Sequence, residues 1–149
     1  MDFIGLEVKF ETLQDNAIPE LAMKVAVNGV VLASDFSIDI LALYNSTQES
    51  GEHFIWTCSC GIPECAGIYR GVLVSYLEDS VLWQAPKIPF EQVARFEFVK
   101  TAYITSVMEG LHEYIRYFKS YRATGIEFDS VPHWQMDEVL AKISNRKFR

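Results

Sequence analysis

The strongest constraint on the fold is an Asn-Gly dipeptide between two runs of apolar, largely β-branched residues. Residues 22–27 precede Asn28 and Gly29, and residues 30–33 follow them. Asn-Gly accepts the positive φ angles of a type I′ turn, whose twist matches that of the two strands it joins. The segment 22–33 is therefore predicted to form an antiparallel hairpin, which makes an all-helical fold untenable.

Further strand patterns occupy most of the chain before residue 100. Alternation of apolar and polar side chains, with β-branched and aromatic residues, predicts strands at residues 3–10, 53–57, 68–77, 81–85 and 94–98. Pro86 and Pro89 prevent the strand before them from continuing through a sheet interior. A less regular pattern at residues 36–44 is consistent with a short helix.

Two helices are predicted after the strands. Apolar residues recur at spacings of three and four within 104–118 and again within 136–143. Gly125 ends the first helix and Pro132 starts the second. No repeat or linker divides the chain, so residues 1–149 are treated as one α+β domain. The expected architecture is an antiparallel sheet of about five to seven strands with two C-terminal helices packed on one face.

Composition excludes several classes of protein. Half of the 149 residues are apolar and 13% are aromatic, which is incompatible with a disordered chain. Apolar runs are only a few residues long, so no membrane span is predicted. Residues 1–8 alternate and include an acid where a secretory signal needs positive charge and a long apolar stretch, so a cytoplasmic location is expected.

Negative charge is concentrated in the first third of the chain. The net charge is −7, which argues against a nucleic-acid partner. Residues 1–52 hold nine acids and two lysines, whereas the remaining residues are neutral overall. This asymmetry indicates either a surface that aids solubility or a docking face for a basic protein, since complementary charge speeds association. The candidate partner-binding residues are Glu7, Glu11, Asp15 and Glu20.

All three cysteines lie within eight residues, at Cys58, Cys60 and Cys65. Thiolates on a tight turn can converge on a metal ion, and Gly61 can supply the left-handed residue that such a turn needs. Only one residue separates the first pair, and the chain has no second cysteine pair. A tetrahedral site therefore needs a fourth ligand from among His53, His112, His133 and Glu64.

Four interpretations of this cysteine motif remain open. A turn of reduced, partly buried thiols without metal is narrowly favoured, because free cysteine packs as a small apolar residue. A zinc site would use Cys58, Cys60 and Cys65 with either one histidine or an external ligand, and His53 is the nearest histidine in sequence. A Cys60–Cys65 disulfide is disfavoured by a cytoplasmic setting. A catalytic cysteine would need a lowered pKa and a positioned base; His53 is near in sequence, but no residue that would orient it is identified.

The string from Thr57 to Ile68 resembles a motif of small uncharacterised bacterial proteins, in which T-C-x-C-G is followed by C-A-G. In those proteins a short aromatic strand precedes the motif and a strand ending near a tryptophan follows it. Phe54, Trp56 and Trp83 match this arrangement, and the resemblance covers about residues 25–120. It implies a bacterial origin and an intracellular setting, and it carries no activity or ligand role.

No catalytic set emerges from the sequence. The glycines are dispersed, no serine nucleophile elbow occurs, and the three histidines stand singly. The expected function is therefore non-catalytic: a cytoplasmic protein-binding protein of the inhibitor or immunity type that docks a basic partner through its acidic N-terminal third. The alternatives are a small zinc-binding domain and a thiol-dependent enzyme with Cys58 or Cys60 as nucleophile. Metal analysis separates the zinc alternative from the other two.

Overall fold

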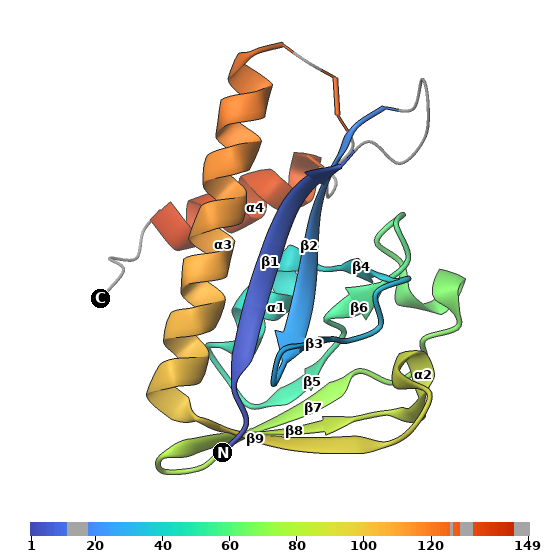
Figure 1. Ribbon diagram of the computed structural model, residues 1–149, viewed down its shortest axis with the longest axis vertical. Coiled ribbons are helices and arrows are strands. Elements are labelled where there is room, and N and C mark those ends of the chain that lie inside the picture. The colour runs from blue at the N-terminus through green and yellow to red at the C-terminus, as the bar shows by residue number, and fades with distance from the viewer. Residues whose placement is uncertain (12–17, 126, 129–132, 145–149) are drawn as a thin grey trace.

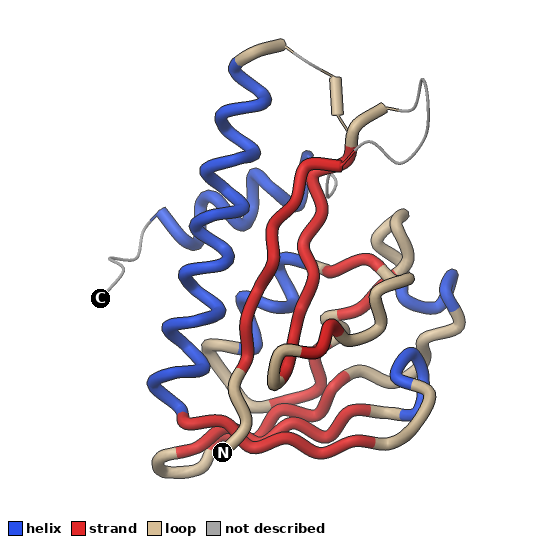
Figure 2. Tube along the Cα trace, in the orientation of Figure 1, coloured by secondary structure: helices blue, strands red, loops and turns tan. Residues whose placement is uncertain are grey.

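The computed structural model describes residues 1–11, 18–125, 127–128 and 133–144 (Figure 1). Its described part is mixed α and β, with antiparallel strand pairing within each sheet. Figure 2 shows a long strand hairpin running beside a long helix, with a second sheet at one end of both. The strands form three small sheets where the sequence predicted one sheet of about five to seven strands, so that prediction was wrong in its sheet count.

The first sheet is built on the predicted hairpin. It contains β1 (Ile4–Glu11), β2 (Glu20–Val27) and β3 (Val30–Val31), in that order. Asn28 and Gly29 have φ angles of 54° and 80°, as a type I′ turn requires. The hairpin prediction is confirmed, and its second strand is shorter than the sequence pattern indicated.

The remaining strands divide between two sheets. A four-stranded sheet has the order β5 (Gly51–His53), β7 (Val72–Tyr76), β8 (Ser80–Ala85) and β9 (Ala94–Val99). A two-stranded sheet pairs β4 (Ser37–Ile38) with β6 (Trp56–Thr57). The strand predicted at 53–57 is therefore two strands in different sheets, because the chain leaves β7 at His53 and pairs with β4 from Trp56 onward. Alternation along the chain does not reveal such a change of partner.

Four α-helices are present in the described residues, whereas the sequence predicted two C-terminal helices and indicated a third, short one. The additional ones are α1 (Ile40–Ser46), which the weak pattern at 36–44 had indicated, and the short α2 (Lys87–Phe90). The Asp39 side chain caps α1 by accepting a hydrogen bond from the Ala42 backbone N–H. The two C-terminal helices are α3 (Lys100–Ala123) and α4 (His133–Ser144). Pro132, the predicted start of the second of these helices, lies outside the described residues.

Helix α3 buries the predicted apolar stripe. Val107, Leu111 and Phe118 are fully buried, and they belong to one core cluster that draws residues from all three sheets and from α1, α3 and α4. The helix packs against β1 along its length and also contacts β2, β8, β9 and α1 (Figure 1). Among the described residues, no helix combines the length and apolar character needed to cross a membrane. A final short element, the 3-10 helix η1 (Pro63–Ala66), lies in the connection from β6 to β7.

We predict that Gly29→Val destabilises the protein by about 1–3 kcal/mol, because a β-branched residue is strained at positive φ. The matched control is Gly5→Val in β1, where the φ angle is ordinary for an L residue and a Cβ atom meets nothing within 4 Å. Urea unfolding measures both variants. Equal midpoints for the two would contradict the assigned role of the turn.

Candidate metal centre

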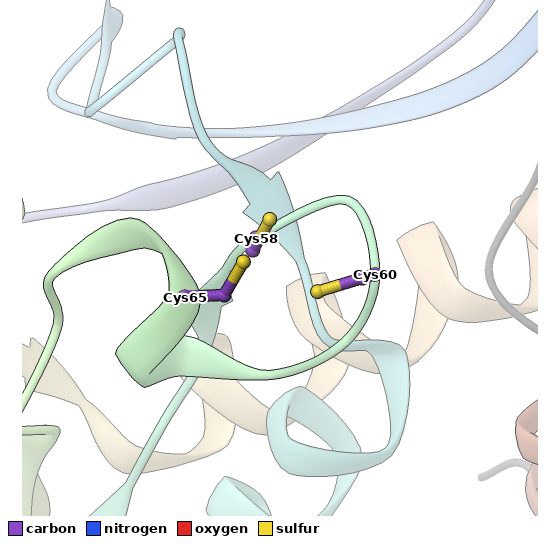
Figure 3. A group of neighbouring side chains, drawn as sticks. All are labelled: Cys58, Cys60 and Cys65. Carbon is purple, nitrogen blue, oxygen red and sulfur yellow. The ribbon is translucent and has the colours of Figure 1, made fainter.

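The three cysteines lie on the connection between β6 and β7. Cys58 follows the end of β6 directly, Cys60 lies in the turn after it, and Cys65 belongs to η1. Figure 3 shows the Cys58 and Cys65 side chains next to each other, with the Cys60 side chain pointing across the loop toward them. The chain therefore leaves a strand, reverses, and returns through one turn of 3-10 helix to bring Cys65 back beside Cys58.

Backbone hydrogen bonds and two left-handed glycines shape this loop. The Gly61 N–H donates to the Cys58 carbonyl at 2.9 Å, which closes a turn around Cys60. The Ile68 N–H donates to the Pro63 carbonyl at 3.1 Å at the end of η1. Gly61 and Gly67 have φ angles of 87° and 79°, which glycine adopts without steric cost. The expectation that Gly61 supplies the left-handed residue is confirmed.

Buried residues anchor both ends of the loop. Trp56 in β6 is 2% exposed, and its indole N–H donates to the Leu32 carbonyl at 3.2 Å. Ile68, just after η1, is 1% exposed and belongs to the core cluster. The loop between them is much more accessible: Cys58 is half-buried, and Cys60 and Cys65 are exposed. The cysteines are thus surface groups held by a buried frame.

The sulfur atoms are close enough to share one ion. All three Sγ atoms lie within 4.8 Å of one another, and all three cysteines are free thiols. Two sulfurs bonded to one zinc ion at about 2.3 Å each lie about 3.8 Å apart in a tetrahedral site.

The cluster stabilises one thiolate at the expense of another. The Cys60 backbone N–H donates a hydrogen bond toward Cys58, and the Cys60 and Cys65 side chains donate weaker ones. Together these hydrogen bonds lower the pKa of Cys58 to about 7. The pKa of Cys65 rises to about 11, because its thiol donates to Cys58 and then to Cys60, and their negative charge opposes its ionisation. Near neutral pH about half of the Cys58 thiols are therefore ionised, whereas Cys65 keeps a proton that a bound metal ion would displace.

The other predicted ligands lie elsewhere or do not join the group. Among the described residues, the only such group of metal-binding side chains is the three cysteines. His53 is 8% exposed, and its Nε2–H donates to the Glu49 carbonyl at 3.0 Å, so the structure does not bring it to the cysteines. Glu64 is exposed in η1 without entering the group, and His112 lies on α3. His133 begins α4, and its side chain is not described.

The predicted acidic docking residues are spread along the β1–β2 pair. Glu7 lies opposite Lys24, and its carboxylate is 3.9 Å from the Lys9 ammonium. Glu11 and Glu20 lie directly opposite each other at the far end of the pair. Asp15 lies outside the described residues. Cations thus flank Glu7, whereas two like charges face each other at Glu11 and Glu20.

A groove that the sequence did not indicate lies between the segments 31–36 and 89–96. Its volume is about 340 Å³, and its apolar lining includes Leu32, Phe36 and Phe96. Asp35 and Glu91 also line it and are both exposed. Only the pairing of distant segments creates this groove, so no local sequence signal could have revealed it.

Comparison with known proteins adds no relative. No protein-family model, curated protein or solved structure matches the chain. What the protein does must therefore be inferred from its own residues and their arrangement.

We predict that alkylation of Cys58 in the reduced, metal-free protein is half-maximal near pH 7. The thiolate is the reactive form, and the donated hydrogen bonds lower the pKa of Cys58 to about 7, from the value of about 8.5 that is typical of free cysteine. Iodoacetamide labelling across neutral pH, read by peptide mass spectrometry, measures this midpoint.

The informative variant is Cys65→Ala, which removes one donor to Cys58 and leaves the Cys60 backbone N–H in place. The Cys58 midpoint should then rise. A midpoint near 8.5 in the parent protein, unchanged by the substitution, would show that the cluster does not form in solution.

Proposed function

We propose that this protein binds one zinc ion through Cys58, Cys60 and Cys65. The observation that carries the proposal is the convergence of the three sulfur atoms within 4.8 Å on one anchored loop. The sequence narrowly favoured packed thiols without metal. Such thiols would be stabilised by burial, but these cysteines lie at or near the surface, so packing alone does not explain why their sulfurs converge. The geometry therefore favours the zinc alternative over the metal-free turn.

The chemistry of the donors supports zinc over the harder divalent ions. Thiolates are soft ligands that select zinc or copper(I), whereas magnesium and calcium take oxygen ligands. One of the three thiols is already ionised in part near pH 7, so binding displaces fewer protons than three isolated thiols would require. Free thiolates also suit a reducing compartment, and we propose the cytoplasm as the location on that ground.

Metal binding would stiffen the connection between two sheets. Cys58 follows β6 of the two-stranded sheet, and Cys65 precedes β7 of the four-stranded sheet. A shared ion would cross-link the two ends of the loop and remove the freedom of the residues between them. Because the loop is exposed and the core is built elsewhere, the ion would mainly order this surface.

We expect protein purified without a metal-affinity tag to contain about one equivalent of zinc per chain, measured by elemental analysis. Cys58→Ser, Cys60→Ser and Cys65→Ser should each lower zinc retention, because each removes a thiolate. A chelator should lower the melting temperature of the parent protein, since binding energy contributes to folding energy.

Two variants serve as matched controls for this experiment. Ser59→Ala changes the same turn without removing a sulfur, and His53→Gln preserves an N–H donor toward the Glu49 carbonyl. Both should retain zinc. Protein that contains no zinc, binds none on titration and does not respond to chelators would contradict the proposal and restore the metal-free turn.

Binding of a basic protein remains the second candidate function, with an inhibitor or immunity role as its specific form. Two observations favour it. Glu11 and Glu20 face each other across β1 and β2, an arrangement that costs stability unless a cation relieves it. Asp35 and Glu91 also line the groove beside its apolar residues. A partner segment that carries a basic side chain next to an apolar one would therefore match the groove in both charge and polarity.

The charge arrangement on the first sheet predicts opposite effects for two similar substitutions. Glu20→Gln should raise the free energy of unfolding by about 0.2–1 kcal/mol, because it removes a like-charge pair with Glu11. Glu7→Gln should leave stability unchanged or lower it by a similar amount, because it removes attraction to Lys9 and Lys24. Urea unfolding at low ionic strength compares them, and a loss of stability in Glu20→Gln would contradict the proposed strain.

A further inference from the structure

The cysteine cluster offers three donors to an ion that takes four. Zinc is almost always four-coordinate in proteins, and sites with three protein ligands hold a fourth from outside. Among the residues that the structure describes, no histidine, aspartate or glutamate joins Cys58, Cys60 and Cys65. This inference rests on the zinc binding proposed above and concerns what completes the coordination.

The cluster is open to a ligand from another molecule. Cys60 and Cys65 are both exposed, and the segment between them carries Ile62, which is 57% exposed, and Glu64, which is also exposed. The buried anchors Trp56 and Ile68 lie at the two ends of the loop. A side chain presented by a second protein could therefore reach an ion held at the exposed Cys60 and Cys65.

Charge selects the chemical class of that fourth donor. A zinc ion with three thiolates carries a net charge of −1, and it would sit on a chain whose own net charge is −7. An anionic fourth donor, whether thiolate or carboxylate, would add another negative charge beside the exposed Glu64 carboxylate. A neutral imidazole adds none and is itself a common zinc ligand.

We propose that a histidine from a different protein supplies the fourth ligand, so that the zinc ion forms part of a protein–protein interface. The three cysteines would hold the ion on this chain, and the imidazole would complete its set of four ligands. Recognition of the partner protein would then depend on the metal site, so that zinc binding and protein binding, which were alternatives on the sequence alone, would be parts of one function.

Cobalt(II) replaces zinc in the test because its visible spectrum reports the donor atoms. The full-length reduced protein is loaded with one equivalent of cobalt(II) under anaerobic conditions, with a phosphine as the reductant. Acetyl-Ala-His-Ala-amide is then titrated in, with acetyl-Ala-Ala-Ala-amide as the blank. Acetate and 2-mercaptoethanol, at the same concentrations, test the two anionic donor classes.

The histidine peptide should shift the ligand-field bands to shorter wavelength in a saturable manner, because nitrogen is a stronger-field donor than water oxygen. The sulfur-to-cobalt charge-transfer band should not grow, and the peptide should bind at least about tenfold more tightly than acetate. The same titration on His53→Gln and His133→Ala should give the same shift.

Any other result of these titrations would contradict one specific part of the proposal. Tighter binding of 2-mercaptoethanol, with growth of the charge-transfer band, would overturn the choice of imidazole. A cobalt spectrum that no added donor alters would show that the chain closes its own site, and a change in that spectrum in His133→Ala would identify the ligand. Zinc-dependent dimerisation in sedimentation experiments would assign the histidine to a second copy. Absence of any thiolate–cobalt absorption would instead refute the proposed zinc binding.

Discussion

The close approach of α3 to β1 at Gly110 is the contact on which the rest of the architecture depends. A Cβ atom at Gly110 would lie 2.3 Å from Leu6 Cδ1 and 2.5 Å from Leu6 Cβ, so only glycine lets the strand come this near to the helix axis. Glycine within a helix costs about 1 kcal/mol relative to alanine. The cost is offset because the approach presses Val8 and Phe10, on the same face of β1 as Leu6, toward the core cluster.

Three hydrogen bonds then tie α3 to the elements around it. The Tyr114 hydroxyl donates to the Leu21 carbonyl in β2 at 3.2 Å, and the Trp83 indole N–H in β8 donates to the Tyr103 oxygen at 3.1 Å. Tyr103 also shares a hydrogen bond of 2.7 Å with the Ser46 hydroxyl in α1. Each pairs a buried polar group that would otherwise cost free energy. One helix thereby connects the hairpin sheet, the four-stranded sheet and α1.

The sequence predicted what is local and missed what depends on distant partners. Asn28-Gly29, the stripe from Val107 to Phe118 and the left-handed residue at Gly61 all follow from conformational preferences over a few residues, and the structure confirms them. The split of the strand after His53 depends on which neighbour each half pairs with, and no periodicity encodes that choice. The cysteine motif pointed to the loop, but the convergence of its sulfurs required the return path through η1. His53, a candidate fourth ligand, lies outside the cysteine group in the structure, where its Nε2–H donates to the Glu49 carbonyl.

The residues that hold the cysteine loop in place belong to the core, whereas the cysteines themselves do not, and this separation explains how the chain can place thiols at its surface. Trp56 contacts Trp83 edge to face, with ring centroids 6.0 Å apart, and Phe90 in the same manner at 4.6 Å, so β6 is fixed by aromatic packing before the cysteines begin. The core cluster contains none of the three cysteines. Their positions are therefore set by a frame that is built from other residues. If the proposed zinc ion binds at these cysteines, it could bind, leave or change its fourth ligand while α3 and the sheets keep their arrangement, which is the property that a metal-dependent contact with another protein requires.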